Sequence, residues 1–91
     1  MADDVRDNPS GHRFELEADA AVATAYYTLE PGVITFTHTE VPPALSGRGI
    51  ASRLIRGALD QVRARGLKVV PKCPFVSAFI GKHAEYQDLL R

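Results

Sequence analysis

The stretch His38–Ser52, HTEVPPALSGRGIAS, contains three local signals in immediate succession. It predicts a strand ending at Val41, a Pro-Pro break at 42–43, and a small-residue turn, SGRG at 46–49, that opens an amphipathic helix. A helix start leaves N–H groups unpaired at its positive end, and glycines let a ligand approach the backbone closely. The stretch therefore predicts a phosphate-binding turn, although glycine-rich turns also precede helices for steric reasons alone.

The residues after this turn predict a helix and then a strand. Apolar side chains recur along 48–65 with the spacing of one helical stripe: Ile50, Leu54, Ile55, Ala58, Leu59 and Val62. Gly66 is typical of a helix end, and LKVVP at 67–71 predicts a short buried strand. Together with the strand at 33–41 this makes a βαβ unit, whose two strands should be parallel. Their carboxyl ends then meet, which places the phosphate turn and Cys73 at one crevice.

The fold class predicted for the whole chain is α/β, or α+β in some schemes. Alternating residues at 13–18, a β-branched and aromatic run at 20–29 and the strand at 33–41 are joined by short turns, which favours a three-stranded antiparallel meander. After the parallel strand at 67–71, short C-terminal helices are expected at about 74–81 and 84–90.

Length and composition indicate one small domain. The 91 residues are 45% hydrophobic, enough for a single core, and we assign 12–91 to that domain and 1–11 to a disordered tail. No long apolar run and no secretory signal are found, and the lone cysteine fits a reducing compartment, so we expect a cytoplasmic protein without membrane contact.

The zero net charge conceals a strong asymmetry. Residues 1–40 contain two basic and eight acidic side chains, a net charge of −6, whereas residues 41–91 contain nine basic and three acidic ones, a net charge of +6. The basic residues lie mostly on one predicted helix without interleaved aromatics. This pattern favours a small phosphorylated ligand over nucleic acid, although ordinary solvated helix faces would explain it as well.

Three side chains are candidates for catalysis. Cys73 lies between Lys72 and Pro74 at a predicted helix start, where an ammonium group and the helix dipole favour thiolate; a small buried hydrophobe is an equally good interpretation. His38 and Glu40 should share the strand face of Ile34 and Phe36, and either is a candidate general base. The three histidines, at 12, 38 and 83, lack metal-ligand spacing with Cys73, so no metal site is predicted.

These motifs resemble the acetyl-coenzyme A binding core of the GNAT superfamily of N-acetyltransferases. HTEVPPALSGRGIASRLI together with GLKVVPKCPFVSAFIGKHAEY is similar to a subgroup of very small, single-domain members, and the resemblance covers roughly residues 12–90. The superfamily turn follows Gln/Arg-x-x-Gly-x-Gly/Ala; Gly49 and Ala51 match it, and Ser46 replaces the first residue. The subgroup has a cysteine near the acetyl thioester, at the position of Cys73. The resemblance implies these cofactor-binding residues: Val41, Ser46, Gly47, Arg48, Gly49, Ile50, Ala51, Ser52, Arg53 and Phe75.

The resemblance implies an enzyme, an acetyl-CoA-dependent N-acetyltransferase (an acyltransferase) with acetyl-CoA as cosubstrate and no metal. The acceptor would be a small amine, a polyamine or a protein lysine. Two routes are open: direct transfer, with Glu40, His38 or water taking the amine proton, and a covalent route through Cys73. Two other functions stay open, a non-catalytic CoA-binding module or sensor and a thiol-dependent hydrolase. We expect a monomer or weak dimer.

Overall fold

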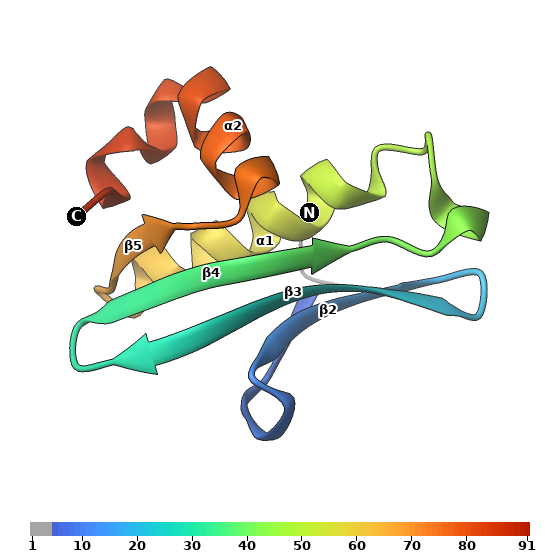
Figure 1. Cartoon of the computed structure of the whole chain (residues 1–91), viewed down its shortest axis with the longest axis horizontal. Coiled ribbons are helices and arrows are strands. Elements are labelled where there is room, and N and C mark those ends of the chain that lie inside the picture. Colours follow the sequence, from blue (N-terminus) through green and yellow to red (C-terminus); the bar gives the residue numbers. More distant parts are fainter. Residues whose placement is uncertain (1–4) are drawn as a thin grey trace.

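The computed structural model describes residues 5–91, and five strands in it form one sheet in the order β1-β2-β3-β4-β5 (Figure 1). The strands are β1 (Val5–Asn8), β2 (Arg13–Ala18), β3 (Ala21–Glu30), β4 (Val33–Glu40) and β5 (Lys68–Pro71). The helices are α1 (Ile50–Ala64) and α2 (Pro74–Lys82), and three 3₁₀ helices are η1 (Pro9–Gly11), η2 (Pro43–Leu45) and η3 (Ala84–Leu89).

The meander and the βαβ unit predicted from the sequence are confirmed. β2, β3 and β4 pair antiparallel through tight turns, and β4 pairs parallel with β5 in the register Val33–Lys68 to Phe36–Pro71. The helix predicted at 48–65 is α1, which begins after Gly49 because that residue is left-handed, with φ 71°. The segment expected as a helix at 84–90 is the tighter η3, and Leu90 forms a parallel bridge with Val69.

The first strand corrects the prediction of a tail over residues 1–11. Residues 5–11 form β1 and η1, and β1 pairs antiparallel with β2; residues 1–4 lie outside the described part of the chain. Val5 is 3% exposed in the core, and its carbonyl accepts a hydrogen bond from Gln61 Nε2 at 2.8 Å. Asp7 accepts hydrogen bonds from the Tyr27 hydroxyl and from Arg65. Tertiary contacts therefore order a segment that has little strand propensity of its own.

Strand β4 contains an irregularity that changes which side its residues face. Tyr26 pairs with His38 and Tyr27 with Phe36. Thr37 is therefore an extra residue with no pairing residue opposite it on β3, which is a β-bulge. Before the bulge, Ile34 and Phe36 are buried in the core. After it, Thr39 is the residue on the core side, opposite the buried Ala25.

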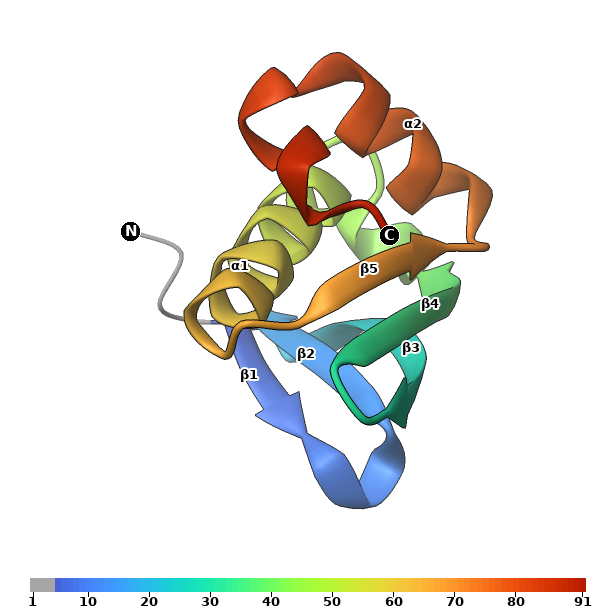
Figure 2. The same ribbon diagram turned by 90° about the vertical axis from the view of Figure 1, so that its left-hand side faces the viewer.

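The core lies between the sheet and α1. The predicted apolar stripe of α1 is buried, and α1 contacts all five strands. Helix α2 packs against α1 and against β4 and β5 (Figure 2). No described helix covers the other side of β2, β3 and β4, which we call the open face of the sheet (Figure 1). None of the helices within residues 5–91 is both long and apolar enough to cross a membrane.

Candidate active site

The predicted phosphate turn has the geometry that its glycines suggest. Gly47 and Gly49 are both left-handed, with φ 77° and 71°, and Gly49 is the N-cap of α1. A Cβ at either position would meet nothing within 4 Å, so backbone conformation and not space requires glycine here. Because Gly49 has no side chain to cap the helix, the first N–H groups of α1 are left for a ligand.

A cavity of about 290 Å³ opens at this turn and at the start of α1. Eight of the nine residues that line it belong to the segment from the end of β4 into α1, and the ninth is Phe75 from the first turn of α2: Val41, Leu45, Ser46, Gly47, Gly49, Ile50, Ala51, Ser52 and Phe75. The structure thus brings eight of the ten predicted cofactor-binding residues to one cavity and adds Leu45; Arg48 and Arg53 do not line it.

Arg48, the charged side chain of the turn, forms an ion pair with the neighbouring hairpin. The Arg48 guanidinium donates a hydrogen bond to Asp19, an ion pair between the phosphate turn and the tip of the β2–β3 hairpin. Both side chains are about half exposed or more, at 47% and 64%. Arg53 lies in the first turn of α1 and is exposed. Any anion that uses Arg48 must therefore compete with the Asp19 carboxylate.

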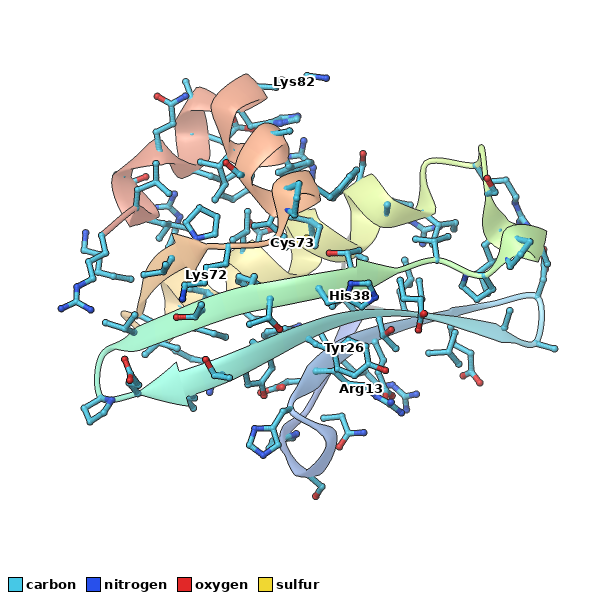
Figure 3. The ribbon with its side chains drawn as sticks, in the orientation of Figure 1. Arg13, Tyr26, His38, Lys72, Cys73 and Lys82 are labelled. Atoms are coloured by element: carbon cyan, nitrogen blue, oxygen red, sulfur yellow. The ribbon has the colours of Figure 1, made fainter. Side chains whose placement is uncertain are left out.

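Cys73 lies where β4 and β5 separate. Its side chain is 4% exposed, its N–H donates to Phe36 O at 2.9 Å, and its carbonyl accepts from Ser77 N at the start of α2. Its sulfur is 3.3 Å from Thr39 Oγ1, so the thiol faces the core side of β4 (Figure 3). Beyond Phe36–Pro71 no described strand pairs with β4 on this side, which leaves a free edge at residues 37–40.

His38 and Glu40 lie on the open face, which corrects the prediction that they share the face of Ile34 and Phe36. The bulge at Thr37 inverts the alternation, so both side chains are exposed, at 61% and 68%, and His38 Nε2 lies 3.9 Å from Glu40 Oε2. The His38 and Tyr26 rings stack with their centres 6.0 Å apart, and the Arg13 guanidinium lies over the Tyr26 ring (Figure 3). The backbone of β4 therefore separates these two side chains from the Cys73 thiol.

The sequence interpretation missed Thr39 and Asp19. Thr39 was overlooked because strict alternation places it on the solvent side, and no glycine or proline marks the bulge. Asp19 did carry a signal, since Asp-Ala between two strands forms the tight turn that brings its carboxylate to Arg48. Within the described residues, no group of three or more His, Cys, Asp or Glu side chains could hold a metal ion.

Comparison with known proteins identifies the family. The model of the family "GCN5-related N-acetyl-transferase" matches residues 13–89. Protein NATD1 of Bos taurus is 37% identical over 59 residues, and that of Gallus gallus is 40% identical over 48 residues. These matches cover 65% and 53% of this chain but 52% and 44% of the relatives, so the chain matches about half the length of each.

A solved structure shares the fold. A GCN5-like protein from Staphylococcus aureus, determined by NMR, superposes with a TM-score of 0.73 over 96% of this chain and 86% of that chain, at 24% sequence identity. From the family match over most of its length, we conclude that this chain belongs to the GCN5-related N-acetyltransferase family.

Proposed function

We propose that this protein binds acetyl-CoA and transfers its acetyl group to an amine. The observation that supports this most strongly is the cavity at the N-terminus of α1, which adjoins the free edge of β4 through Val41. The cavity offers unpaired backbone N–H groups and the positive end of a 15-residue helix to a pyrophosphate. Family membership supports acetyl transfer in general.

The free edge of β4 suits the rest of the ligand. Residues 38–40 pair with β3 on one side only, so the backbone groups on their other side are open to an added strand. The pantetheine arm of CoA is an extended chain with two amides, and such a chain can add to a strand edge by main-chain hydrogen bonds. It would run from the cavity at Val41 toward Cys73 and Thr39.

Two chemical routes fit the residues around this edge. Bound acetyl-CoA supplies a thioester whose acetyl carbon bonds to the amine nitrogen while the CoA thiolate leaves. In direct transfer, His38, Glu40 or a water on the open face takes the amine proton. In the covalent route the Cys73 thiolate accepts the acetyl group first, and the amine then displaces it. Burial of Cys73 and its contact with Thr39 favour direct transfer, with Cys73 as a packing residue.

A CoA-binding module without catalysis is the second candidate. The observation that favours it is the separation of His38 and Glu40 from the thiol of Cys73 by the backbone of β4, which leaves no preassembled nucleophile and base. Tight binding of acetyl-CoA without transfer to small amines, polyamines or lysine peptides would support this candidate over the enzyme.

Calorimetric titration with acetyl-CoA tests the binding site directly. In Ser52→Asp a carboxylate replaces an exposed hydroxyl at the third residue of α1, where it favours the helix dipole but repels a bound pyrophosphate. We expect the variant to keep its fold and melting temperature while its affinity falls on the order of ten-fold. Thr28→Glu, an equal charge change near the opposite end of β4, should leave affinity unchanged. Unaltered binding by Ser52→Asp would refute the site.

Intact-mass measurement separates the two routes. The protein is mixed with acetyl-CoA, and acetylated peptides are mapped. An acetyl group on Cys73, together with loss of turnover in Cys73→Ala, would establish the covalent route. Full turnover by Cys73→Ala at saturating substrate would exclude it and leave direct transfer.

A further inference from the structure

Thr24 is a buried polar residue on the open face of the sheet. Its neighbours in β3, Ala23 and Ala25, are buried on the core side, so the Thr24 side chain points to the open face. It is only 7% exposed, and within residues 5–91 its hydroxyl has no hydrogen-bond partner. Every fully buried side-chain oxygen or nitrogen in this part of the chain does have one, so the Thr24 hydroxyl must be reachable from outside. A ligand on the open face can therefore complete its hydrogen bonding.

Two carboxylates flank this hydroxyl, and they differ in how well their charge is neutralised. Thr24 lies opposite Glu15 of β2 and opposite Glu40 of β4. Glu15 accepts a hydrogen bond from Arg13 Nε at 2.6 Å. Glu40 is 68% exposed, and its charged neighbour within residues 5–91 is His38, with 3.9 Å between Nε2 and Oε2. Among the described residues, Glu40 thus leaves a carboxylate without an arginine or lysine partner beside an unpaired hydroxyl.

The chemistry of this pair suits a primary ammonium group. An ammonium has three donors and no acceptor, whereas a carboxylate only accepts and a hydroxyl can accept. Val22, the next residue on the same face of β3, is 38% exposed and offers an apolar contact to methylene groups. Glu17 lies opposite Val22, and its exposed ion pair with Arg6 is long, at 3.9 Å, so its charge still repels an anionic group on the ligand. The open face therefore favours an alkylammonium over a zwitterionic α-amino acid.

We propose that Thr24 and Glu40 bind the ammonium group of the acetyl acceptor, and that this acceptor is a primary alkylamine. The inference rests on the proposed function, because it assumes that the acetyl thioester lies along the free edge of β4. Glu40 belongs both to that edge and to the open face, so an ammonium bound to it lies beside the edge. Free diamines and lysine side chains both present this group, and turnover separates these two sources.

Binding of small amines tests the site without turnover. Butylamine and alanine both have a protonated amine at neutral pH, but alanine has a carboxylate next to it. In an NMR titration at low salt, butylamine should shift the signals of Val22, Thr24 and Glu40 and bind about ten-fold more tightly than alanine. Thr24→Val keeps the β-branched shape and removes the hydroxyl, and we expect about three- to ten-fold weaker butylamine binding. Thr28→Val, the same change at an exposed position on the same face, should bind like the wild type.

Turnover with acetyl-CoA identifies the source of the alkylamine. Putrescine represents free diamines, and a lysine-containing peptide represents proteins. For the acceptor, Glu40→Gln and Thr24→Val should each raise KM about three-fold or more, and Thr28→Val should not.

Three results would overturn the inference while acetyl-CoA binding still stands. They are unchanged butylamine affinity in Thr24→Val, alanine binding as tightly as butylamine, and transfer to neither amine or to one whose KM neither variant changes. If acetyl-CoA itself does not bind, the proposed function fails and this inference with it.

Discussion

Two residues at the tip of the β2–β3 hairpin, Asp19 and Ala20, connect turn geometry to the proposed ligand site. Asp19 and Ala20 both have left-handed backbones, with φ 50° and 63°, as a two-residue turn of this hand requires. Such a backbone suits aspartate but penalises alanine. The same tip places the Asp19 carboxylate on Arg48 of the phosphate turn. The hairpin tip therefore contains Ala20, whose backbone is strained, and Asp19, whose carboxylate pairs with Arg48 of the proposed site.

Replacing Ala20 with glycine should stabilise the protein. Glycine removes the steric cost of φ 63°, and part of this gain is lost to the greater freedom of the unfolded chain, so we expect about 0.5–1 kcal/mol in the free energy of unfolding. Urea denaturation measures this change. Gly32→Ala, at φ 76° in the β3–β4 turn and with open space around it, is the reverse experiment and should destabilise by about 1 kcal/mol. A less stable Ala20→Gly variant would contradict the turn geometry.

Releasing Arg48 from Asp19 should strengthen ligand binding. Asp19→Asn removes the competing negative charge and keeps a side chain that tolerates a left-handed backbone. We expect about three-fold tighter binding of acetyl-CoA at low salt, and a smaller gain at high salt because both groups are exposed. Glu17→Gln, on the same hairpin but paired with Arg6, is the control and should not change affinity. Weaker binding by Asp19→Asn would show that the ion pair positions the turn instead of competing with the ligand.

Among the elements, β1 depends most on contacts made elsewhere in the chain. Val5 is its only buried residue, inserted into the core beside α1. Val5→Ala should lower the free energy of unfolding by about 1–2 kcal/mol and weaken the hydrogen-exchange protection of β1. Val22→Ala, at a side chain that is 38% exposed on β3, should cost less than about 0.5 kcal/mol. Equal effects of the two substitutions would mean that β1 contributes nothing to the core.

The sequence was sufficient for most elements and for the backbone of the glycine turn before α1, because these depend on local signals. The apolar stripe of α1 and the glycines at 47 and 49 specify their structures through periodicity and backbone freedom. β1 and the bulge depend on distant contacts instead. Residues 5–8 read VRDN, in which three of four side chains are polar, and their order comes from Tyr27, Gln61 and Arg65. Thr37 looks like any strand residue until its partners on β3 are known.

At the scale of the whole molecule, two tyrosines attach peripheral segments to the core. The Tyr27 hydroxyl donates to Asp7 of β1 at 2.5 Å, and the Tyr86 hydroxyl of η3 donates to Asp60 of α1 at 2.7 Å. Both side chains are 4% exposed. Burial, reinforced in each case by the carboxylate partner, raises the pKa of both phenols to about 12.

These raised pKa values predict alkaline unfolding. An unfolded tyrosine has a pKa of about 10, so the folded state favours the neutral phenol. The stability that each tyrosine contributes is complete below about pH 10 and is lost as the pH rises to about 12, at roughly 2–3 kcal/mol per tyrosine. Denaturation measured across this range should show a falling free energy of unfolding.

Single substitutions assign this pH dependence. Tyr27→Phe and Tyr86→Phe should each be about 1 kcal/mol less stable than wild type at pH 7, because each loses a hydrogen bond. Between pH 10 and 12, however, each variant should lose less stability than the wild type. If both variants follow the wild-type slope, other groups are responsible for alkaline unfolding.

The extra residue in β4 also affects how catalytic roles are compared between relatives. Before Thr37 the even-numbered positions, Ile34 and Phe36, point into the core; after it the odd-numbered Thr39 does. The alternation of side chains between the core and the open face therefore shifts by one residue at Thr37. A homologue of the same length without the bulge would present the counterpart of His38, instead of Thr39, to the Cys73 thiol. Alignments across this position consequently need to be anchored separately on each side of Thr37.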